Sequence, residues 1–220
     1  MAFVDRRDAG RRLAALLVES GSWEMERPVV VGMARGGVPV AFEVAGALHA
    51  PLEVVVVRKL GHPRQPELGL GAIAEDGVRV VNDALVRKLG VSGDVIDAVV
   101  AEQTVELERR LRLYRGDRAP VSVRGRTAIV VDDGLATGFT ARAAIEVMRR
   151  RGAARVVLAV PVGPPDSLDA LREVADEVVC VETPARFFGL SEWYEDFGQL
   201  GDDEVAGLLE PDGPLEPGGQ

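Results

Sequence analysis

The sequence is poor in cysteine and in long uncharged runs, and each shortage excludes a class of protein. Its one cysteine, Cys180, excludes an internal disulfide framework and a paired-cysteine metal site, so we expect a reduced, cytoplasmic protein. The longest stretch without a charged side chain is residues 156–165, far shorter than the roughly 18 residues that span a membrane. The first residues carry charges without an apolar segment behind them, and this pattern predicts no secretory signal.

The sequence also has fewer basic than acidic side chains. The chain has 26 basic and 35 acidic side chains and a formal net charge of −9, which argues against broad nucleic-acid binding but leaves room for a local anion site. With 220 residues, 47% of them hydrophobic, the chain has the composition of a globular protein. We expect a single domain over residues 1–209 and a frayed tail over residues 210–220, where the sequence is EPDGPLEPGGQ.

Short apolar runs alternate with helical patterns along the chain. The runs rich in valine, isoleucine and leucine predict strands at residues 28–32, 52–57, 70–74, 78–81, 127–131, 155–160 and 178–181. Helices are expected at residues 11–20, 38–48, 92–114, 138–151 and 165–174. This alternation predicts an α/β fold with a doubly wound, mostly parallel sheet flanked by helices. In such a sheet, ligands bind in the loops that follow the carboxyl ends of the strands.

The loop after the expected strand 127–131 carries the most informative residues. Asp132 and Asp133 are followed by a small, hydroxyl-rich turn that contains Thr137 and Thr140 and leads into an expected helix. Backbone N–H groups, the helix dipole and the two hydroxyls together make a cradle for a phosphate group. Because carboxylates do not favour a phosphate directly, sugar hydroxyls or a Mg²⁺ ion would have to lie between them.

Other ligand-binding motifs do not fit this segment. A Walker A loop requires a lysine in the turn and a dinucleotide fingerprint requires the pattern GxGxxG, and neither occurs here. A receiver-like acidic pocket would need a lysine beyond a later strand, and the chain has none after Lys88. The remaining alternative is a strand-end turn with two solvated aspartates.

The segment VVDDGLATGFT resembles the ribose-phosphate signature of type I phosphoribosyltransferases, which use 5-phosphoribosyl 1-diphosphate (PRPP). The resemblance extends over about residues 28–205 and implies the fold of that family, with a small C-terminal hood at about residues 183–200. It implies that Asp132 and Asp133 hold the ribose hydroxyls. The residues implied to bind the 5-phosphate are Ala136, Thr137, Gly138, Phe139 and Thr140. Gly134 departs from the pattern, which usually has a bulkier residue at this position.

Two further segments are similar to loops of the same family. The segment MARGG follows the first expected strand and resembles the diphosphate loop, which often contains a non-proline cis peptide bond. Arg35, Gly36 and Gly37 are thereby implied to bind PRPP; a glycine-rich turn is the alternative. Arg58 and Lys59 precede LGHPRQPELG, an expected loop that resembles the mobile lid of adenine-type members and implies that both residues meet PRPP. A solvated pair at a strand end is the alternative for them.

The resemblance gives mixed indications about the acceptor base. Ala136 stands where 6-oxopurine-using members have an aspartate, and adenine-type members have alanine there. Glu75, in the segment AEDG, lies where adenine-type members carry a proposed catalytic glutamate. Glu75 is therefore a candidate acid–base residue, with an exposed turn carboxylate as the alternative.

The segment ETPARFFG at residues 182–189 resembles the hood of 6-oxopurine members, in which a phenylalanine stacks on the base. Phe187 is the first candidate for base binding, with Phe188 and Trp193 in reserve, because aromatic faces suit flat heterocycles. The alternative is that these aromatic residues pack the terminal segment onto the core. Glu192 matches a hood carboxylate that reaches a second Mg²⁺ ion. The implied metal ligands are Asp132, Asp133 and Glu192.

The resemblance thus implies transfer of the 5-phosphoribosyl group from PRPP to a purine-like base, with release of diphosphate and Mg²⁺ as cofactor. The implied catalytic residues are Asp132, Asp133, Lys59 and Glu75. It also implies a role in nucleotide salvage and a homodimer. The net charge and the lack of a long uncharged run predict neither nucleic acid nor membrane as a partner. The competing hypothesis is a non-catalytic protein that senses PRPP or a nucleotide on the same fold.

Overall fold

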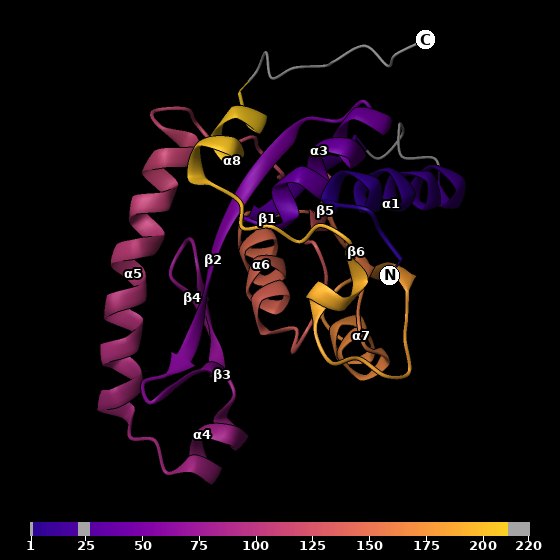
Figure 1. The fold of residues 1–220 in the computed structure, drawn as a ribbon. Coiled ribbons are helices and arrows are strands. Elements are labelled where there is room, and N and C mark those ends of the chain that lie inside the picture. Colours follow the sequence, from indigo (N-terminus) through magenta and orange to yellow (C-terminus); the bar gives the residue numbers. More distant parts are fainter. Residues whose placement is uncertain (1, 22–26, 211–220) are drawn as a thin grey trace.

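The computed structural model describes residues 2–21 and 27–210, and its centre is a sheet with helices on both faces (Figure 1). Within these residues seven strands follow the order β4-β3-β2-β1-β5-β6-β7. The strand β3 is antiparallel to β2 and β4, and the other neighbouring pairs are parallel. The strands are β1 (Val29–Ala34), β2 (Leu52–His62), β3 (Gln65–Ala74), β4 (Val78–Val81), β5 (Thr127–Val131), β6 (Arg155–Val162) and β7 (Glu177–Glu182).

The helices divide between the two faces of the sheet. One face is covered by α6 and α7, and the other by α1, α3, α5 and α8. The long helix α5 runs along the sheet beside β2 (Figure 1). The helices are α1 (Arg6–Ser20), α3 (Gly37–Ala47), α4 (Asp83–Leu89), α5 (Gly93–Arg115), α6 (Phe139–Arg150), α7 (Pro165–Arg172) and α8 (Asp202–Leu208), with a 3₁₀ turn η1 (Leu190–Trp193).

The valine runs form the core because a strand covered on both faces needs apolar side chains on each. In β1, Val29 and Val31 pack toward α6, whereas Val30 packs toward α1 and α3. All three are fully buried. The expected doubly wound, mostly parallel α/β fold is confirmed, and every expected strand is present.

Some elements differ from the expectation. Helix α1 begins at Arg6, earlier than expected, because Asp5 caps it: the Asp5 carboxylate accepts a 2.7 Å hydrogen bond from the backbone N–H of Asp8. The short elements α4, α8 and η1 were not expected from the sequence. Of the expected tail, all but Glu210 lies outside the described residues.

The expected lid loop is a second difference. Residues 58–69 form the outer part of a β-hairpin in which β2 and β3 pair as far as His62 and Gln65, with a tight turn at Pro63 and Arg64. Glycines and prolines favoured a loop in the sequence, but the antiparallel partner supplies backbone hydrogen bonds that this segment lacks alone. Register shifts around Gly61 absorb the irregular residues.

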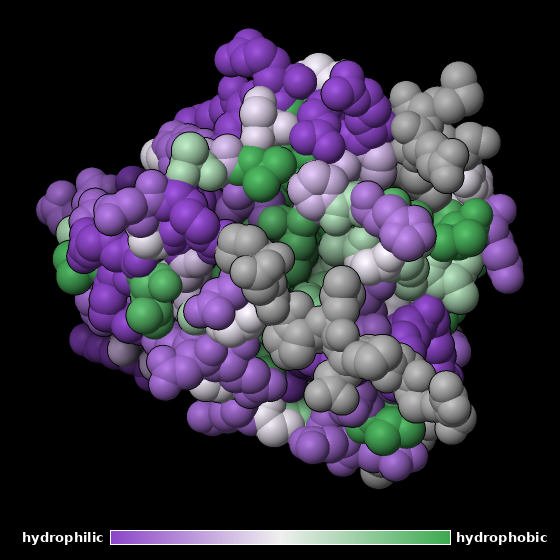
Figure 2. Space-filling model, turned by 90° about the horizontal axis from the view of Figure 1, so that it is seen from above, coloured by the Kyte–Doolittle hydropathy of each residue, from purple (hydrophilic) through white to green (hydrophobic). Residues whose placement is uncertain are grey.

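The N-terminal segment of the described chain lies against the hood. Phe3 forms a parallel bridge with Tyr194, and its N–H donates a 2.9 Å hydrogen bond to the carbonyl of Trp193. Among the helices of the described residues, none has both the length and the apolar character needed to cross a bilayer. In the view of Figure 2, hydrophilic residues cover most of the surface and hydrophobic residues form small separate areas.

Candidate functional site

The loops after β1 and β5 meet because these strands are parallel neighbours in register, with Gly32 opposite Val131. A Cβ atom at Gly36 would lie 2.1 Å from Oδ2 of Asp133, and one at Gly37 would lie 2.4 Å from the carbonyl oxygen of Val131. Only glycine allows these loops to approach so closely. The peptide bond between residues 34 and 35 is cis, as the resemblance implied. The diphosphate-type loop and the acidic pair therefore form one site.

The acidic pair is held from several sides. Nε of Arg6 donates a 2.8 Å hydrogen bond to Oδ2 of Asp133 within an ion pair whose two side chains are each nearly nine-tenths buried. The hydroxyl of Tyr194 donates to the backbone carbonyl of Asp133 at 2.5 Å. Oδ1 of Asp132 accepts a 2.9 Å bond from the N–H of Asp133. These contacts fix the acidic loop before any ligand arrives.

Burial and nearby charges shift the pKa values of the two carboxyls. Burial raises the pKa of Asp132 well above its ordinary value, and the neighbouring charge of Asp133 raises it further. Burial also raises the pKa of Asp133, although the charge of Arg6 opposes the rise. Two carboxylates in such surroundings favour a cation or hydroxyl donors as neighbours.

The phosphate-type turn follows directly and remains open. Gly138 adopts φ +75° immediately before α6, a left-handed conformation that suits glycine. Ala136 and Thr137 are exposed, while Phe139 and Thr140 are half-buried in the first turn of the helix. Ser167 donates to the carbonyl of Ala136 at 2.7 Å. Since the first amides of a helix have no partner within it, this turn can present N–H groups to an anion.

The structure brings Arg35 and Arg58 together beside α5. Burial lowers the pKa of Arg58, and the nearby charges of Arg110 and Arg35 lower it further. Nε and Nη2 of Arg58 donate to Oε1 of Gln103 at 3.0 and 2.8 Å. Nη1 of Arg35 lies 3.8 Å from the Asp202 carboxylate at the start of α8. Clustered guanidinium groups of this kind suit a multiply charged anion.

The same carboxylate ties α8 to α5. Oδ1 of Asp202 accepts a 2.5 Å bond from the Tyr114 hydroxyl, and its Oδ2 accepts a 2.9 Å bond from Arg109. These hydrogen bonds lower the pKa of Asp202, with Tyr114 contributing most. Helix α8 therefore holds an ionised carboxylate next to Arg35.

Lys59 is not brought to this cluster. Because residues 58 and 59 lie in a strand, their side chains point to opposite faces. Nζ of Lys59 donates to the carbonyl of Glu67 in the same hairpin at 2.6 Å, and the side chain is 44% exposed. The expected loop around Arg58 and Lys59 is corrected to a strand, in which the two side chains face opposite ways.

Glu75 also lies elsewhere. Its side chain is 3% exposed, its Oε1 accepts from the N–H of Val56 at 2.8 Å, and its Oε2 accepts from Arg115 at 2.9 Å and from Arg151 at 2.6 Å. Arg151 follows the C-terminal end of α6, the end opposite the phosphate-type turn. Both alternatives for Glu75, catalytic acid–base residue and exposed turn carboxylate, give way to a buried ion-pair partner.

The aromatic cluster of the hood mostly packs inward. Phe187 and Trp193 pack with the buried residues Phe3 and Tyr194. Phe188, in contrast, is 83% exposed. Packing thus accounts for Phe187, the first candidate for base binding. Of the three candidates, Phe188 is the one whose ring is exposed.

Glu192 does not join the acidic pair. It is exposed on η1, and no group of three or more potential metal ligands is found within the described residues. Asp132 and Asp133 alone suit Mg²⁺, which is commonly held by one or two carboxylates together with waters and substrate phosphates. The donor set of this site therefore fits an ion that arrives with a phosphorylated substrate.

The structure explains why residue 134 is a glycine and not the bulkier residue of the family pattern. It has φ +155°, and a Cβ atom there would lie 2.1 Å from Cδ2 of Leu190 in η1 and 3.1 Å from the carbonyl of Val162. The hood side chain Leu190 thus fills the space that a bulkier residue would take. The missing side chain lets the hood pack onto the acidic loop.

Replacing Gly134 with alanine should lower the free energy of unfolding by about 1–3 kcal/mol, because of the strained φ and the contact with Leu190. Urea denaturation measures this change. The double variant Gly134→Ala, Leu190→Ala should show a smaller combined loss than the two single losses added. Additive losses would mean that the Leu190 contact does not limit this position.

Several residues of the site were missed by sequence reasoning. Arg6, Tyr194, Gln103 and Asp202 lie outside the motifs and reach the site only through the fold. Asp5 and Asp8 do carry the signal of a helix start, and it could have placed Arg6 in the first turn of α1. No local pattern marks the other three.

Residues 5–196 match the family model described as the phosphoribosyl transferase domain, and this match includes α1, which lies before residue 28. Two Mycobacterium tuberculosis proteins, from strains CDC 1551 / Oshkosh and ATCC 25618 / H37Rv, are each 52% identical over 208 residues, and each is provisionally named a phosphoribosyl transferase. The match covers 94% of this chain and 46% of each relative, so the chain spans about half their length. The crystal structure of TT1426 from Thermus thermophilus is 41% identical, with a TM-score of 0.77 over 95% of this chain and 98% of that one.

Proposed function

Because the chain belongs to the phosphoribosyl transferase domain family, we propose that it transfers the 5-phosphoribosyl group of PRPP to a flat, purine-like base and releases diphosphate. The observation that carries this proposal is the meeting of three elements: the Arg35 loop, the acidic pair and the turn before α6. Their order matches the three parts of PRPP, which are diphosphate, ribose and 5-phosphate.

Each part of the substrate has its own residues in this proposal. The turn from Ala136 to Thr140 binds the 5-phosphate through backbone N–H groups and threonine hydroxyls. Asp132 and Asp133 accept hydrogen bonds from the ribose hydroxyls. Arg35 and Arg58 stabilise the diphosphate, with backbone donors of Gly36 and Gly37 beside them.

The reaction then is a displacement at C1 of the ribose. A ring nitrogen of the base forms a bond to C1 and gives up its proton to solvent, and the bond from C1 to the diphosphate oxygen breaks with its electron pair leaving on the diphosphate. Negative charge grows on the leaving diphosphate, so preorganised cations near it lower the barrier most. Mg²⁺, when bound with the substrate, adds positive charge at the diphosphate. Asp132 and Asp133 are the residues of this chain that would hold the ion.

The identity of the acceptor base is the least constrained part of the proposed reaction. Ala136 provides no side-chain partner for a base, and Phe188 offers an exposed aromatic face in the hood. Stacking on such a face suits any flat heterocycle and therefore sets a class of base. We further propose one domain over residues 1–209, acting as a homodimer in cytoplasmic nucleotide salvage without nucleic acid or membrane partners.

The test mixes the protein with PRPP, Mg²⁺ and a panel of purine and related bases and follows the release of diphosphate. We expect release that depends on one base or a few related ones, and none in the presence of EDTA. PRPP binding without release for any base would instead favour the non-catalytic sensor. Absence of both binding and release would reject the proposal.

A further inference from the structure

Arg6 is a basic residue built into the candidate site, and no motif marks it. Its Nε is bonded to Oδ2 of Asp133 at 2.8 Å, and its Nη1 donates to the carbonyl of Gly198 at 2.9 Å. The guanidinium carbon lies 4.0 Å from the centre of the Phe197 ring. The side chain is 13% exposed. A guanidinium fixed at so many points loses little further entropy when it binds a ligand.

This guanidinium lines a cavity on the diphosphate side of the site. The cavity has a volume of about 430 Å³ and is lined by Arg6, Arg35, Gly36 and residues 197–200. Two cations and a glycine loop thus face the same space. A diphosphate carries several negative charges, and paired arginines are suited to such groups.

Arg6 has donors left for a ligand. A guanidinium has five N–H donors, and the bonds to Asp133 and Gly198 use one on Nε and one on Nη1. Because these donors lie in the plane of the guanidinium, the Phe197 ring over one face does not use them. Each arginine of the cavity has one acidic neighbour: Asp133 pairs with Arg6, and Asp202, which is shared with Arg109, lies 3.8 Å from Arg35.

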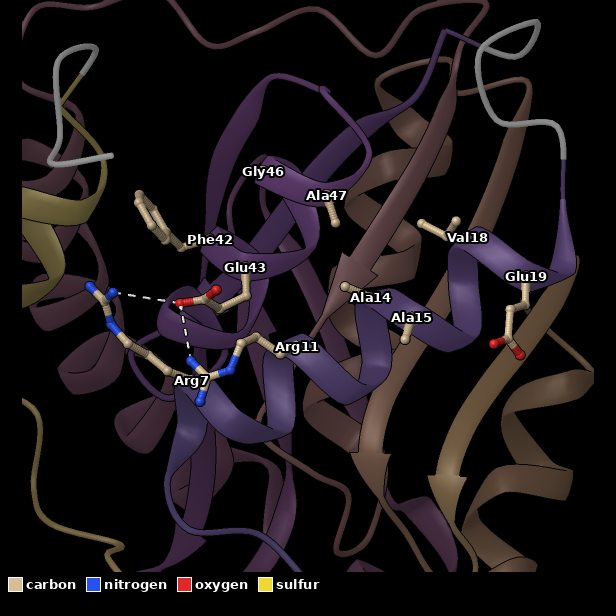
Figure 3. A pocket seen from close by; sticks show the side chains of 10 residues that line it. All are labelled: Arg7, Arg11, Ala14, Ala15, Val18, Glu19, Phe42, Glu43, Gly46 and Ala47. Atoms are coloured by element: carbon tan, nitrogen blue, oxygen red, sulfur yellow. Dashed lines mark ion pairs between the residues drawn. The ribbon is translucent and has the colours of Figure 1, made fainter. Parts of the chain in front are cut away.

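The other arginines of α1 differ from Arg6. Arg7 and Arg11 lie 3.5 and 4.0 Å from the carboxylate of Glu43, in an open groove between α1 and α3 (Figure 3). Their side chains are 45% and 58% exposed. Such exposed pairs contribute little to stability or binding. Burial and contact with the acidic pair therefore set Arg6 apart on its own helix.

We propose that Arg6 is a PRPP-binding residue: it positions Asp133 through Nε and offers its free N–H donors to the diphosphate beside Arg35. This inference rests on the proposed function and deepens it. It gives the N-terminal helix a direct part in the site, because α1 brings Arg6 to the acidic loop. It also links the hood to the substrate, since Gly198 and Phe197 hold the same guanidinium.

The test measures binding of inorganic diphosphate and of PRPP, each with Mg²⁺, by titration calorimetry. Arg6→Gln keeps a side-chain donor for Asp133 but removes the charge, and it should weaken diphosphate binding by at least about tenfold. Arg6→Lys should recover most of that loss. Arg11→Ala is the matched control on the same helix and should bind like the unchanged protein.

The outcomes separate the two levels of inference. If the unchanged protein binds PRPP and diphosphate but Arg6→Gln binds diphosphate equally well, Arg6 is only structural and this proposal is wrong, whereas the proposed function stands. If the unchanged protein binds neither ligand, both fail. Should Arg6→Gln not fold, the Nε–H resonance of Arg6 in the unchanged protein decides: it should shift on addition of diphosphate, and an unmoved resonance would overturn the proposal.

Discussion

Replacing Glu75 with alanine should lower the free energy of unfolding by about 3–5 kcal/mol, because it leaves buried charges without a partner. Arg115 and Arg151 both donate to this carboxylate. Burial acts to lower the pKa of each arginine, but the hydrogen bonds and charges of acidic neighbours raise it overall. The backbone N–H of Val56 would lose its acceptor as well. Urea denaturation of the variant measures the loss.

The control is Glu146→Ala, which breaks the exposed pair with Arg150 near the same end of α6. It should cost only about 0.3–0.5 kcal/mol. Glu75→Gln then separates stability from chemistry, since it keeps an acceptor for Val56 but has no acid–base function. We expect reduced stability with turnover per folded molecule preserved. Normal stability with abolished turnover would restore Glu75 as a catalytic residue.

Changing Asp132 and Asp133 together to asparagine should reduce affinity for PRPP with Mg²⁺ by about a hundredfold or more. Hydrogen bonds to a charged group contribute about 1.5–3 kcal/mol each, and two such groups are lost. Titration calorimetry measures the change. The control Asp169→Asn alters an exposed carboxylate of α7 and should leave PRPP affinity unchanged. Equal affinity in the double variant would remove the acidic pair from the site.

When metal is removed with EDTA, the single variant Asp132→Asn should be more stable than the unchanged protein. The folded protein raises the pKa of Asp132, so its stabilising contribution is complete below the unfolded value of about 3.9 and is lost as pH rises through the raised value. Above the raised pKa, the ionised carboxylate is therefore a cost that asparagine avoids. Thermal melting, measured between pH 4 and 8 in steps of about one pH unit, should show the unchanged protein losing stability relative to the variant as the pH rises.

The fold could be predicted from the sequence because its core strands are short runs of valine and isoleucine. Such strands need apolar cover on both faces of the sheet, which the helices supply. Residues 127–131 illustrate this: all five are buried in β5, as the apolar run of residues 128–131 indicates. The acidic pair and the glycines near residue 36 were also accessible, since each lies directly after a strand. Parallel neighbouring strands then bring the loops together.

The rest depends on contacts between distant segments. The segment around Gly61 contains loop-forming residues, but its pairing with β3 makes it a strand, and that change turns Lys59 away from Arg58. Glu75 was assigned by its position in a motif, whereas its environment is set by arginines on α5 and after α6. Arg6 lies 127 residues from Asp133 in the chain. No local spacing reports such contacts.

The most direct test of the central claim is a crystal structure of the protein with a non-hydrolysable PRPP analogue and Mg²⁺. The account predicts the 5-phosphate at the amides of residues 136–140, the ribose hydroxyls on Asp132 and Asp133, and the diphosphate in the cavity between Arg6 and Arg35. An analogue bound away from these residues, for instance in the groove that holds Arg79 and Arg142, would contradict it.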